Sequence, residues 1–107
     1  MTLIAEHCAP QHGKTALTPA DVDVLLSQLN GWQRRDQALC KTFSFANYHE
    51  TMAFVNACAW VAHRQDHHPD LSVHYNRVDM VFTTHDAGGL TRNDLICAAK
   101  IEALFTL

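Results

Sequence analysis

The sequence predicts an α+β fold of two layers, in which three helices cover one face of a four-stranded antiparallel sheet. Three segments begin with helix-capping residues and continue with apolar residues at helical spacing. Between them, two pairs of segments alternate apolar and polar residues, as strands with one buried face do. The elements follow in the order α-β-β-α-β-β-α, and 107 residues suit one domain. A sheet with helices on one face is the natural two-layer core for such a chain.

The first helix is expected directly after an irregular N-terminal segment. Residues 1–16 show no sustained period, so we expect a flexible tail there, followed by a single domain at residues 17–107. Thr18 is a good N-cap and Pro19 suits the first helical position. Asn30-Gly31 should end the helix. Its apolar face comprises Val22, Leu25, Leu26 and Leu29.

A hairpin and the longest helix are expected next. Residues 34–37 are polar and should form the turn between two strands within residues 32–45. Asn47 and Glu50 have the capping-box spacing, and no Gly or Pro interrupts residues 48–65. We expect the apolar face of this helix to comprise Met52, Val55, Ala59 and His63, widened by Phe54, Ala57 and Val61.

A second hairpin and a last helix complete the domain. Pro69 should end the long helix and leave His68 extended. Asn76-Arg77 leaves room only for a tight turn, and Thr91 with Asp94 has the spacing that opens a helix. That helix should run to about Leu104, after Gly88-Gly89 has broken the preceding strand. The alternating apolar positions of the hairpin are Leu71, Val73 and Tyr75, then Val78, Met80 and Phe82.

Composition and charge narrow the class of protein. The net charge is −3 with histidine neutral, whereas nucleic-acid binders usually carry a basic surface. No apolar run approaches the ~20 residues of a membrane helix, and the N-terminus lacks the pattern of a secretory signal. The four cysteines are scattered without a Cys-x-x-Cys motif. We therefore expect a cytoplasmic protein with free thiols and neither a nucleic acid nor a membrane as partner.

Histidine is abundant, with eight in the chain, and three of these are placed to meet. His67 and His68 stand where the long helix passes into a strand. That strand runs away from them and its partner returns, so His85 should arrive beside them. Imidazole has a pKa near 6.5, which suits general acid/base catalysis.

A zinc site is the other way to use these residues. Three imidazoles and a water form a known catalytic zinc shell. Adjacent residues of an extended chain point to opposite sides, however, so His67 and His68 cannot easily face one ion. His63 and His67 have the spacing of two ligands on one helix face, but the helix should end there. We expect proton transfer and no metal.

Several motifs resemble those of the pterin-4a-carbinolamine dehydratases, and the resemblance spans residues 17–105. It is carried by Asp66-His67-His68-Pro69-Asp70, by Tyr75-Asn76-Arg77-Val78, by residues 83–91 with Asp94, and upstream by Leu17-Thr18-Pro19, Gly31-Trp32 and residues 52–56. The resemblance implies dehydration of 4a-hydroxytetrahydropterin to quinonoid dihydropterin, without metal or cofactor. This reaction recycles the pterin used by aromatic amino acid hydroxylases.

The resemblance also implies the site residues. The family's catalytic residues match His67, His68, His85 and Asp94, and its substrate contacts match His67, His68, Pro69, Thr84, His85, Asp86 and Ala87. We expect His67 to be the main proton carrier, His85 its counterpart across the pterin ring, and His68 to orient the substrate. Asp94 has an alternative role as a helix cap. Two positions depart from the family: His63 replaces a frequent acidic residue, and Leu71 an aromatic one common in animal members.

The expected partners are the pterin substrate and further copies of this chain. Phe43, Phe45, Tyr75 and Phe82 are more aromatic than a solvated sheet face needs, and the resemblance likewise implies a homodimer or homotetramer. Functional coupling to an aromatic amino acid hydroxylase follows from the recycling role. The alternative is a dimerisation module for a transcription factor without essential catalysis, and a role near pterin-type molybdenum cofactors is a third hypothesis.

Overall fold

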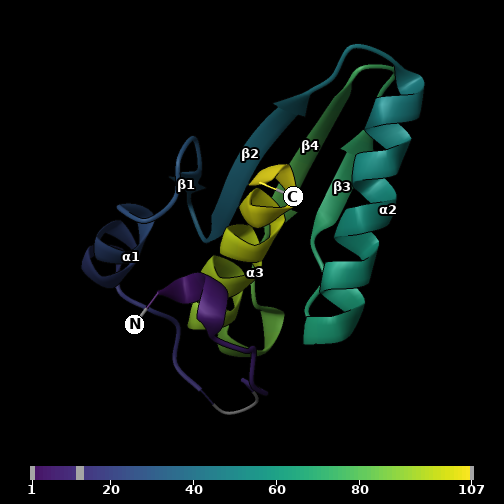
Figure 1. Ribbon diagram of the computed structural model, residues 1–107. Helices are drawn as coiled ribbons and strands as arrows, with labels where there is room; N and C mark the ends of the chain where they lie inside the picture. Colours follow the sequence, from purple (N-terminus) through teal and green to yellow (C-terminus); the bar gives the residue numbers. More distant parts are fainter. Residues whose placement is uncertain (1, 12–13, 107) are drawn as a thin grey trace.

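The computed structural model, which describes residues 2–11 and 14–106, has the predicted α+β architecture (Figure 1). Three helices and four strands follow in the predicted order. They are α1 (Pro19–Leu26), β1 (Gln33–Arg35), β2 (Ala38–Ser44), α2 (Tyr48–Gln65), β3 (Asp70–Val73), β4 (Arg77–Phe82) and α3 (Arg92–Ala103). Three short 3-10 turns accompany them, η1 (Leu3–Ala5), η2 (His85–Ala87) and η3 (Leu104–Thr106). Among the described residues, no helix is both long and apolar enough to cross a membrane.

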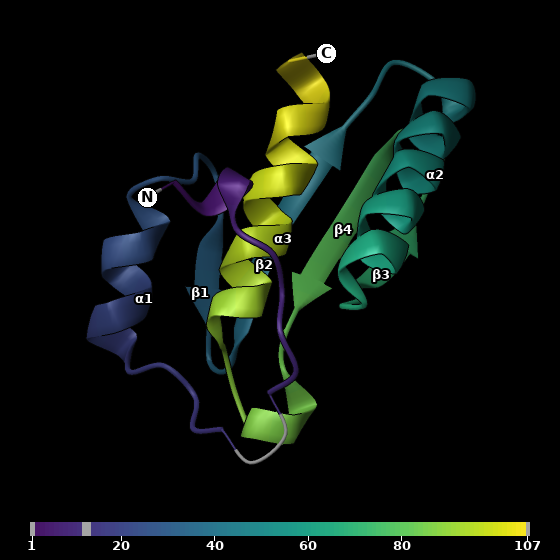
Figure 2. The same cartoon turned by 60° about the horizontal axis from the view of Figure 1, so that its bottom comes forward.

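The four strands form one antiparallel sheet in the order β1-β2-β4-β3. The central pair runs in register from Leu39 opposite Phe82 to Ser44 opposite Arg77. Helices α2 and α3 lie over the same face of this sheet, and α1 lies beside the β1 edge (Figure 2). In the second hairpin β3 ends at Val73, so Tyr75 belongs to the turn and not to the strand as predicted. The C-terminal end of α2 and the turn η2 lie at the same end of the sheet (Figure 1).

The core lies between the sheet and the two covering helices. The sheet contributes fully buried apolar side chains at Leu39, Val78, Met80 and Phe82, and α3 contributes Leu95 and Ile101. Burying these side chains is the main source of stability for the two layers.

The predicted face of α2 is wrong by one position along the helix. The buried residues are Thr51, Phe54, Cys58 and Ala62, whereas Ala59 and His63 are exposed. Small side chains such as Thr51, Cys58 and Ala62 let the helix approach the sheet closely. A prediction from the spacing of large apolar residues does not favour these positions. The Thr51 hydroxyl is satisfied within the core because it lies 2.9 Å from the carbonyl oxygens of Asn47 and Tyr75.

The N-terminal segment is packed where a loose tail was expected. Leu3 is 1% exposed within the core, and the Lys100 ammonium donates to the carbonyl of Ile4 at 2.7 Å. The Arg92 guanidinium donates two hydrogen bonds, of 2.6 and 2.7 Å, to the Glu6 carboxylate. Single anchors of this kind leave no periodic pattern, so they cannot be predicted from the sequence. Residues 1, 12 and 13 of the expected tail lie outside the described residues.

Candidate active site

His67 is turned toward the sheet by the way α2 ends. Asp66 adopts the left-handed conformation, with φ 51° and ψ 42°, which stops the helix. The next residue then leaves the helix axis, and its ring lies parallel to that of Phe82, with centroids 5.9 Å apart and an angle of 6° between the planes. The His67 side chain is 12% exposed. It is therefore held against the core with one part of the ring accessible.

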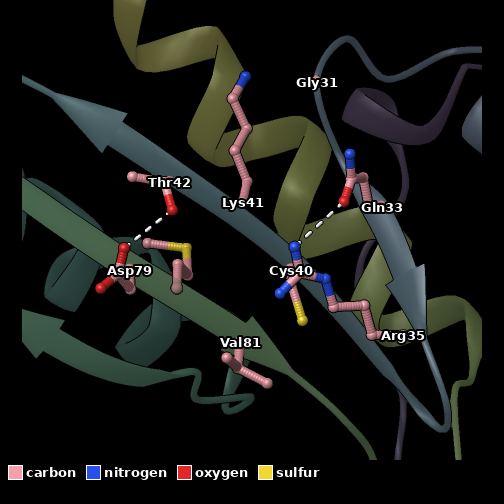
Figure 3. A pocket seen from close by; sticks show the side chains of 9 residues that line it. Gly31, Gln33, Arg35, Cys40, Lys41, Thr42, Asp79 and Val81 are labelled. Carbon is pink, nitrogen blue, oxygen red and sulfur yellow. Dashed lines mark hydrogen bonds between the residues drawn. The ribbon is translucent and has the colours of Figure 1, made fainter.

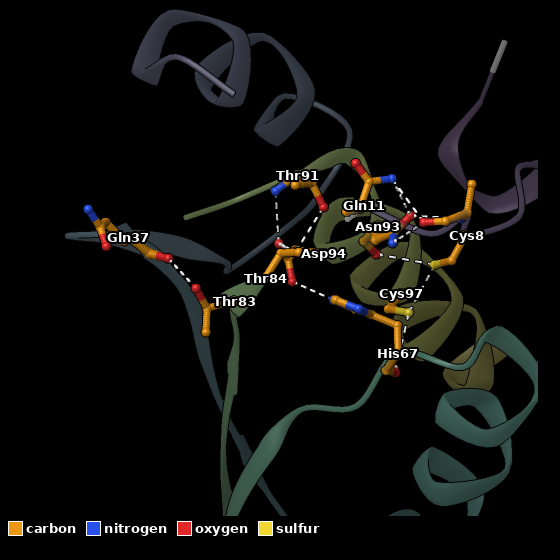
Figure 4. Close-up of polar contacts among 11 residues, drawn as sticks. Cys8, Gln11, Gln37, His67, Thr83, Thr84, Thr91, Asn93, Asp94 and Cys97 are labelled. Atoms are coloured by element: carbon orange, nitrogen blue, oxygen red, sulfur yellow. Dashed lines mark hydrogen bonds and ion pairs between the residues drawn. The ribbon is translucent and has the colours of Figure 1, made fainter. Parts of the chain in front are cut away.

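A buried carboxylate orients this imidazole. His67 Nε2 lies 2.6 Å from Oδ1 of Asp94, whose side chain is fully buried (Figure 4). The second oxygen, Oδ2, accepts hydrogen bonds from the Thr84 hydroxyl at 2.7 Å and from the Thr91 backbone N–H at 2.9 Å. The hydroxyls of Thr84 and Thr91 also lie 2.8 Å apart. Both oxygens of the carboxylate thus have hydrogen-bond partners, which makes burial of its charge tolerable.

Asp94 serves both roles that the sequence left open. Its hydrogen bond to the Thr91 N–H satisfies a backbone donor at the start of α3, as a cap does. Its other oxygen binds the imidazole, so one carboxylate starts the helix and orients His67. Because the carboxylate accepts Nε2–H, it selects the tautomer in which Nδ1 is free to accept a proton.

The environment of His67 changes its pKa in two opposing ways. Burial is the largest single effect and lowers the pKa, whereas the hydrogen bond to Asp94 and the charge of that carboxylate raise it. Together the raising effects are larger, so the pKa of His67 lies above its usual value. A larger fraction of this imidazole is therefore protonated near neutral pH than of a free one.

An NMR titration of the histidine ring protons should place the pKa of His67 above about 6.5, the value for unfolded chain. Protonation of His67 then stabilises the fold by an amount that is fully present below about pH 6.5 and lost as the pH rises through the folded-state pKa. Asp94→Asn should lower this pKa, because it removes the charge. A His67 pKa at or below 6.5 in the unaltered protein would contradict the expected effect of the carboxylate.

A cavity of about 260 Å³ opens beside this pair. Its lining includes Gln65 at the end of α2, Asp66 and His67 directly after it, and Thr84 and Asp86 after β4. A second wall is formed by Cys8, Ala9, Pro10, Gln11 and Asn93. This second wall was not predicted from the sequence, because the position of residues 8–11 depends on tertiary contacts such as that of Ala9 with Asn93. A second hollow of about 330 Å³ adjoins at Thr84 and includes His85.

The structure brings together only some of the predicted site residues. His67, Thr84 and Asp86 line one cavity, with Asp94 behind them. His68 and His85 are exposed, and among the described side chains no hydrogen bond or ion pair joins either of them to His67. Pro69 is half-buried, and Ala87 lies in the turn η2. Within residues 2–11 and 14–106, no group of three or more His, Cys, Asp or Glu side chains is placed to hold a metal ion.

A larger hollow of about 620 Å³ lies elsewhere, along strands β1, β2 and β4 (Figure 3). Its lining includes Cys40 and Lys41, and a hydrogen bond of 2.8 Å from the Thr42 hydroxyl to Asp79 crosses it. It contains no imidazole and none of the predicted site residues. The cavity at His67 is the better candidate because, of the hollows lined by described residues, it is the one where a buried carboxylate orients a group that can move protons.

Comparison with known proteins gives a consistent result. The sequence profile of the family described as pterin 4 alpha carbinolamine dehydratase matches residues 15–104. A protein of Chromobacterium violaceum, provisionally named a pterin-4-alpha-carbinolamine dehydratase, is 61% identical over 105 residues, which cover 98% of this chain and 97% of that protein. A protein of Nitrosospira multiformis with the same provisional name is 48% identical, covering 98% of this chain and 94% of its own.

Two solved structures are also similar. A crystal structure from Brucella melitensis, described as a transcriptional coactivator/pterin dehydratase, has a TM-score of 0.80 and 34% identity, covering 84% of this chain and 98% of that one. A pterin dehydratase-like protein, described as a RuBisCO assembly factor in the alpha-carboxysome, has a TM-score of 0.57 and 26% identity, covering 68% of this chain and 84% of that one.

Proposed function

This chain belongs to the pterin 4 alpha carbinolamine dehydratase family, and on that premise we propose that it converts 4a-hydroxytetrahydropterin to quinonoid dihydropterin and water. The observation that carries the proposal is the His67–Asp94 pair at the wall of a cavity. The reaction places the protein in pterin recycling, where its substrate is the product of a pterin-dependent aromatic amino acid hydroxylase.

The chemistry requires two proton transfers. The bond between C4a and the hydroxyl oxygen breaks, a proton joins that oxygen to give water, and N5 loses its proton as the C4a–N5 double bond forms. Each positioned acid or base contributes roughly 10² to 10⁴ in rate. Nδ1 of His67 is suited to exchange one of these protons with the substrate, because the carboxylate holds the other ring nitrogen.

The remaining predicted residues receive roles by their positions. His85 begins η2 beside the hollow that adjoins Thr84, so we assign it the proton transfer on the far side of the pterin ring. His68, exposed and next to His67, and Asp86 at the cavity wall would bind and orient the pterin. Pro69 and Ala87 would contribute to the edges of the same site.

The dehydratase test generates the carbinolamine in situ with a hydroxylase and follows quinonoid dihydropterin by absorbance. We expect the chain to accelerate its formation over buffer and to do so equally after treatment with a chelator, since His67 and His85 need no metal for these transfers. No acceleration by the folded, unaltered chain would reject the proposal and favour a protein-binding role. Loss of activity with the chelator, restored by zinc, would reject the metal-free mechanism.

We also propose that the protein is a homodimer or homotetramer. The aromatic side chains of the sheet support this less than expected, because Phe43 and Phe82 are buried in the chain's own core. Better support comes from aromatic side chains on the surface: Trp60 of α2 is 63% exposed and Tyr75 is 64% exposed. Sedimentation at micromolar concentration should give a multiple of 12.0 kDa, and a clean monomer would contradict this.

A further inference from the structure

Two cysteines that the proposed dehydration does not use lie in contact beside the candidate site. Cys8 Sγ and Cys97 Sγ are 3.5 Å apart, although 89 positions separate them in the sequence (Figure 4). We propose that Cys8 and Cys97 are a redox modification site, which a hydroperoxide converts to an intramolecular disulfide. The proposal concerns the thiols alone and does not depend on the proposed function.

The fold holds the two thiols opposite each other. Cys97 lies on α3, one turn after Asp94, and its side chain is fully buried. Cys8 is half-buried at the cavity wall, and its backbone N–H donates to the Gln65 side chain at 2.9 Å. Asn93 then accepts from the N–H of Ala9 at 3.0 Å and donates to its carbonyl at 2.7 Å. These contacts hold the segment around Cys8 against the end of α2 and the start of α3.

The step from this contact to a bond is small. A disulfide needs its sulfurs about 2.05 Å apart, so the two atoms must approach by roughly 1.5 Å. Residues 6–11 form no helix or strand, so the backbone around Cys8 can make this adjustment without breaking regular structure. Cys97 can remain in its place in α3.

The two thiols differ in reactivity in the way that such a pair requires. A hydrogen bond from the Cys97 thiol, the largest effect, lowers the pKa of Cys8, and the charge of His67 acts in the same direction against burial. The same hydrogen bond together with burial raises the pKa of Cys97. Thiolate therefore forms at Cys8, the more accessible sulfur, and thiolate is the form that peroxides oxidise.

The chemistry balances with one equivalent of hydroperoxide, ROOH. The Cys8 thiolate attacks the terminal peroxide oxygen, the O–O bond breaks, and Cys8 becomes a sulfenic acid while ROOH is reduced to the alcohol ROH. The Cys97 sulfur then attacks Cys8 Sγ. The S–S bond forms, the S–O bond breaks, and the hydroxide leaves with the Cys97 proton as water. Both sulfurs are oxidised by one electron each, and a dithiol reductant reverses the change.

The new bond would join the N-terminal segment covalently to α3. Residues 2–11 precede the segment that the family profile matches, which begins at residue 15. Cys8 belongs to one wall of the cavity and Cys97 approaches the backbone carbonyl of His67 at 3.9 Å. Oxidation would therefore fasten the wall that faces His67.

The test treats the full chain with one equivalent of hydrogen peroxide after complete reduction, then blocks remaining thiols in denaturant. We expect titratable thiols to fall from four to two per chain. After tryptic digestion, the peptide of residues 1–14 should be found linked by a disulfide to the peptide of residues 93–100, and dithiothreitol should separate them. Oxidation of Cys8 to sulfinic acid without this linkage, or a Cys8 link between two chains, would overturn the proposal.

Variants identify the part each sulfur plays. Cys97→Ser, or Cys97→Ala if the hydroxyl disturbs the buried site, should leave a Cys8 sulfenic acid that dimedone traps, because no second thiol is in contact with it. Cys8→Ser should keep its three remaining thiols through the same treatment. Cys40→Ser is the matched control, since Cys40 is also half-buried but lies on β2. It should form the Cys8–Cys97 linkage as the unaltered chain does, and a loss of two thiols from Cys8→Ser under the same treatment would contradict the assignment.

Discussion

His67→Ala should lower kcat/KM for carbinolamine dehydration by about 10² or more, which corresponds to at least ~2.7 kcal/mol of transition-state stabilisation. The substitution removes the imidazole that Asp94 orients at the cavity wall, and with it the free Nδ1. It leaves the carboxylate its two other hydrogen bonds, from Thr84 and Thr91, so the fold should persist. Rates measured at several substrate concentrations separate the loss in kcat from any loss in binding.

The control for this experiment is His74→Ala. His74 is exposed in the turn between β3 and β4, and we expect its removal to change the rate by less than about twofold. His85→Ala should cost about as much as His67→Ala if the two imidazoles act on opposite sides of the ring. If the double variant His67→Ala/His85→Ala catalyses dehydration as fast as the unaltered chain, with its circular dichroism unchanged, the histidine mechanism is wrong.

Asp94→Asn should reduce kcat/KM by about 10² to 10⁴, although asparagine has nearly the same shape. Both groups that meet Oδ2, the Thr84 hydroxyl and the Thr91 N–H, donate hydrogen bonds, so the amide oxygen must face them. The amide NH₂ then points at Nε2 of His67 and donates to it. The imidazole is forced into the tautomer with its proton on Nδ1, which removes the acceptor at the cavity side.

The same substitution should destabilise the protein by roughly 1 to 3 kcal/mol, because a charged acceptor of buried hydrogen bonds becomes neutral. Urea denaturation measures this loss, and nitrogen chemical shifts of the His67 ring report the tautomer. Asp79→Asn is the control, since Asp79 is partly exposed on β4 and pairs with Arg77. An Asp94→Asn protein with full activity and an unchanged His67 tautomer would show that the carboxylate acts only as a helix cap.

The fold was predictable because its signals are local. Thr18 with Pro19 starts α1, Asn47 starts α2, and the alternation from Val78 to Phe82 gives β4 with its buried face. Each of these depends on residues within a few positions of one another. The face of α2 was harder, because burial of Thr51 and Cys58 depends on what packs against them.

The site was only partly predictable for the same reason. The junction at His67 and the capping position of Asp94 are visible in the sequence, and their contact follows once the second hairpin and α3 are in place. The wall around Cys8 was not, because its position depends on tertiary contacts such as that of Ala9 with Asn93. The short turn η2, which carries the exposed His85, was not predicted either.

The double use of Asp94 bears on how relatives of this protein could change over evolutionary time. A lineage that gives up dehydration can replace His67 and still keep the contacts of the carboxylate with Thr84 and Thr91. It cannot replace Asp94 as freely, since the start of α3 depends on it. Relatives that have acquired other functions should therefore retain Asp94 and its two threonines while the residue at position 67 varies. Asp94 would then indicate common descent, and His67 would indicate dehydratase activity.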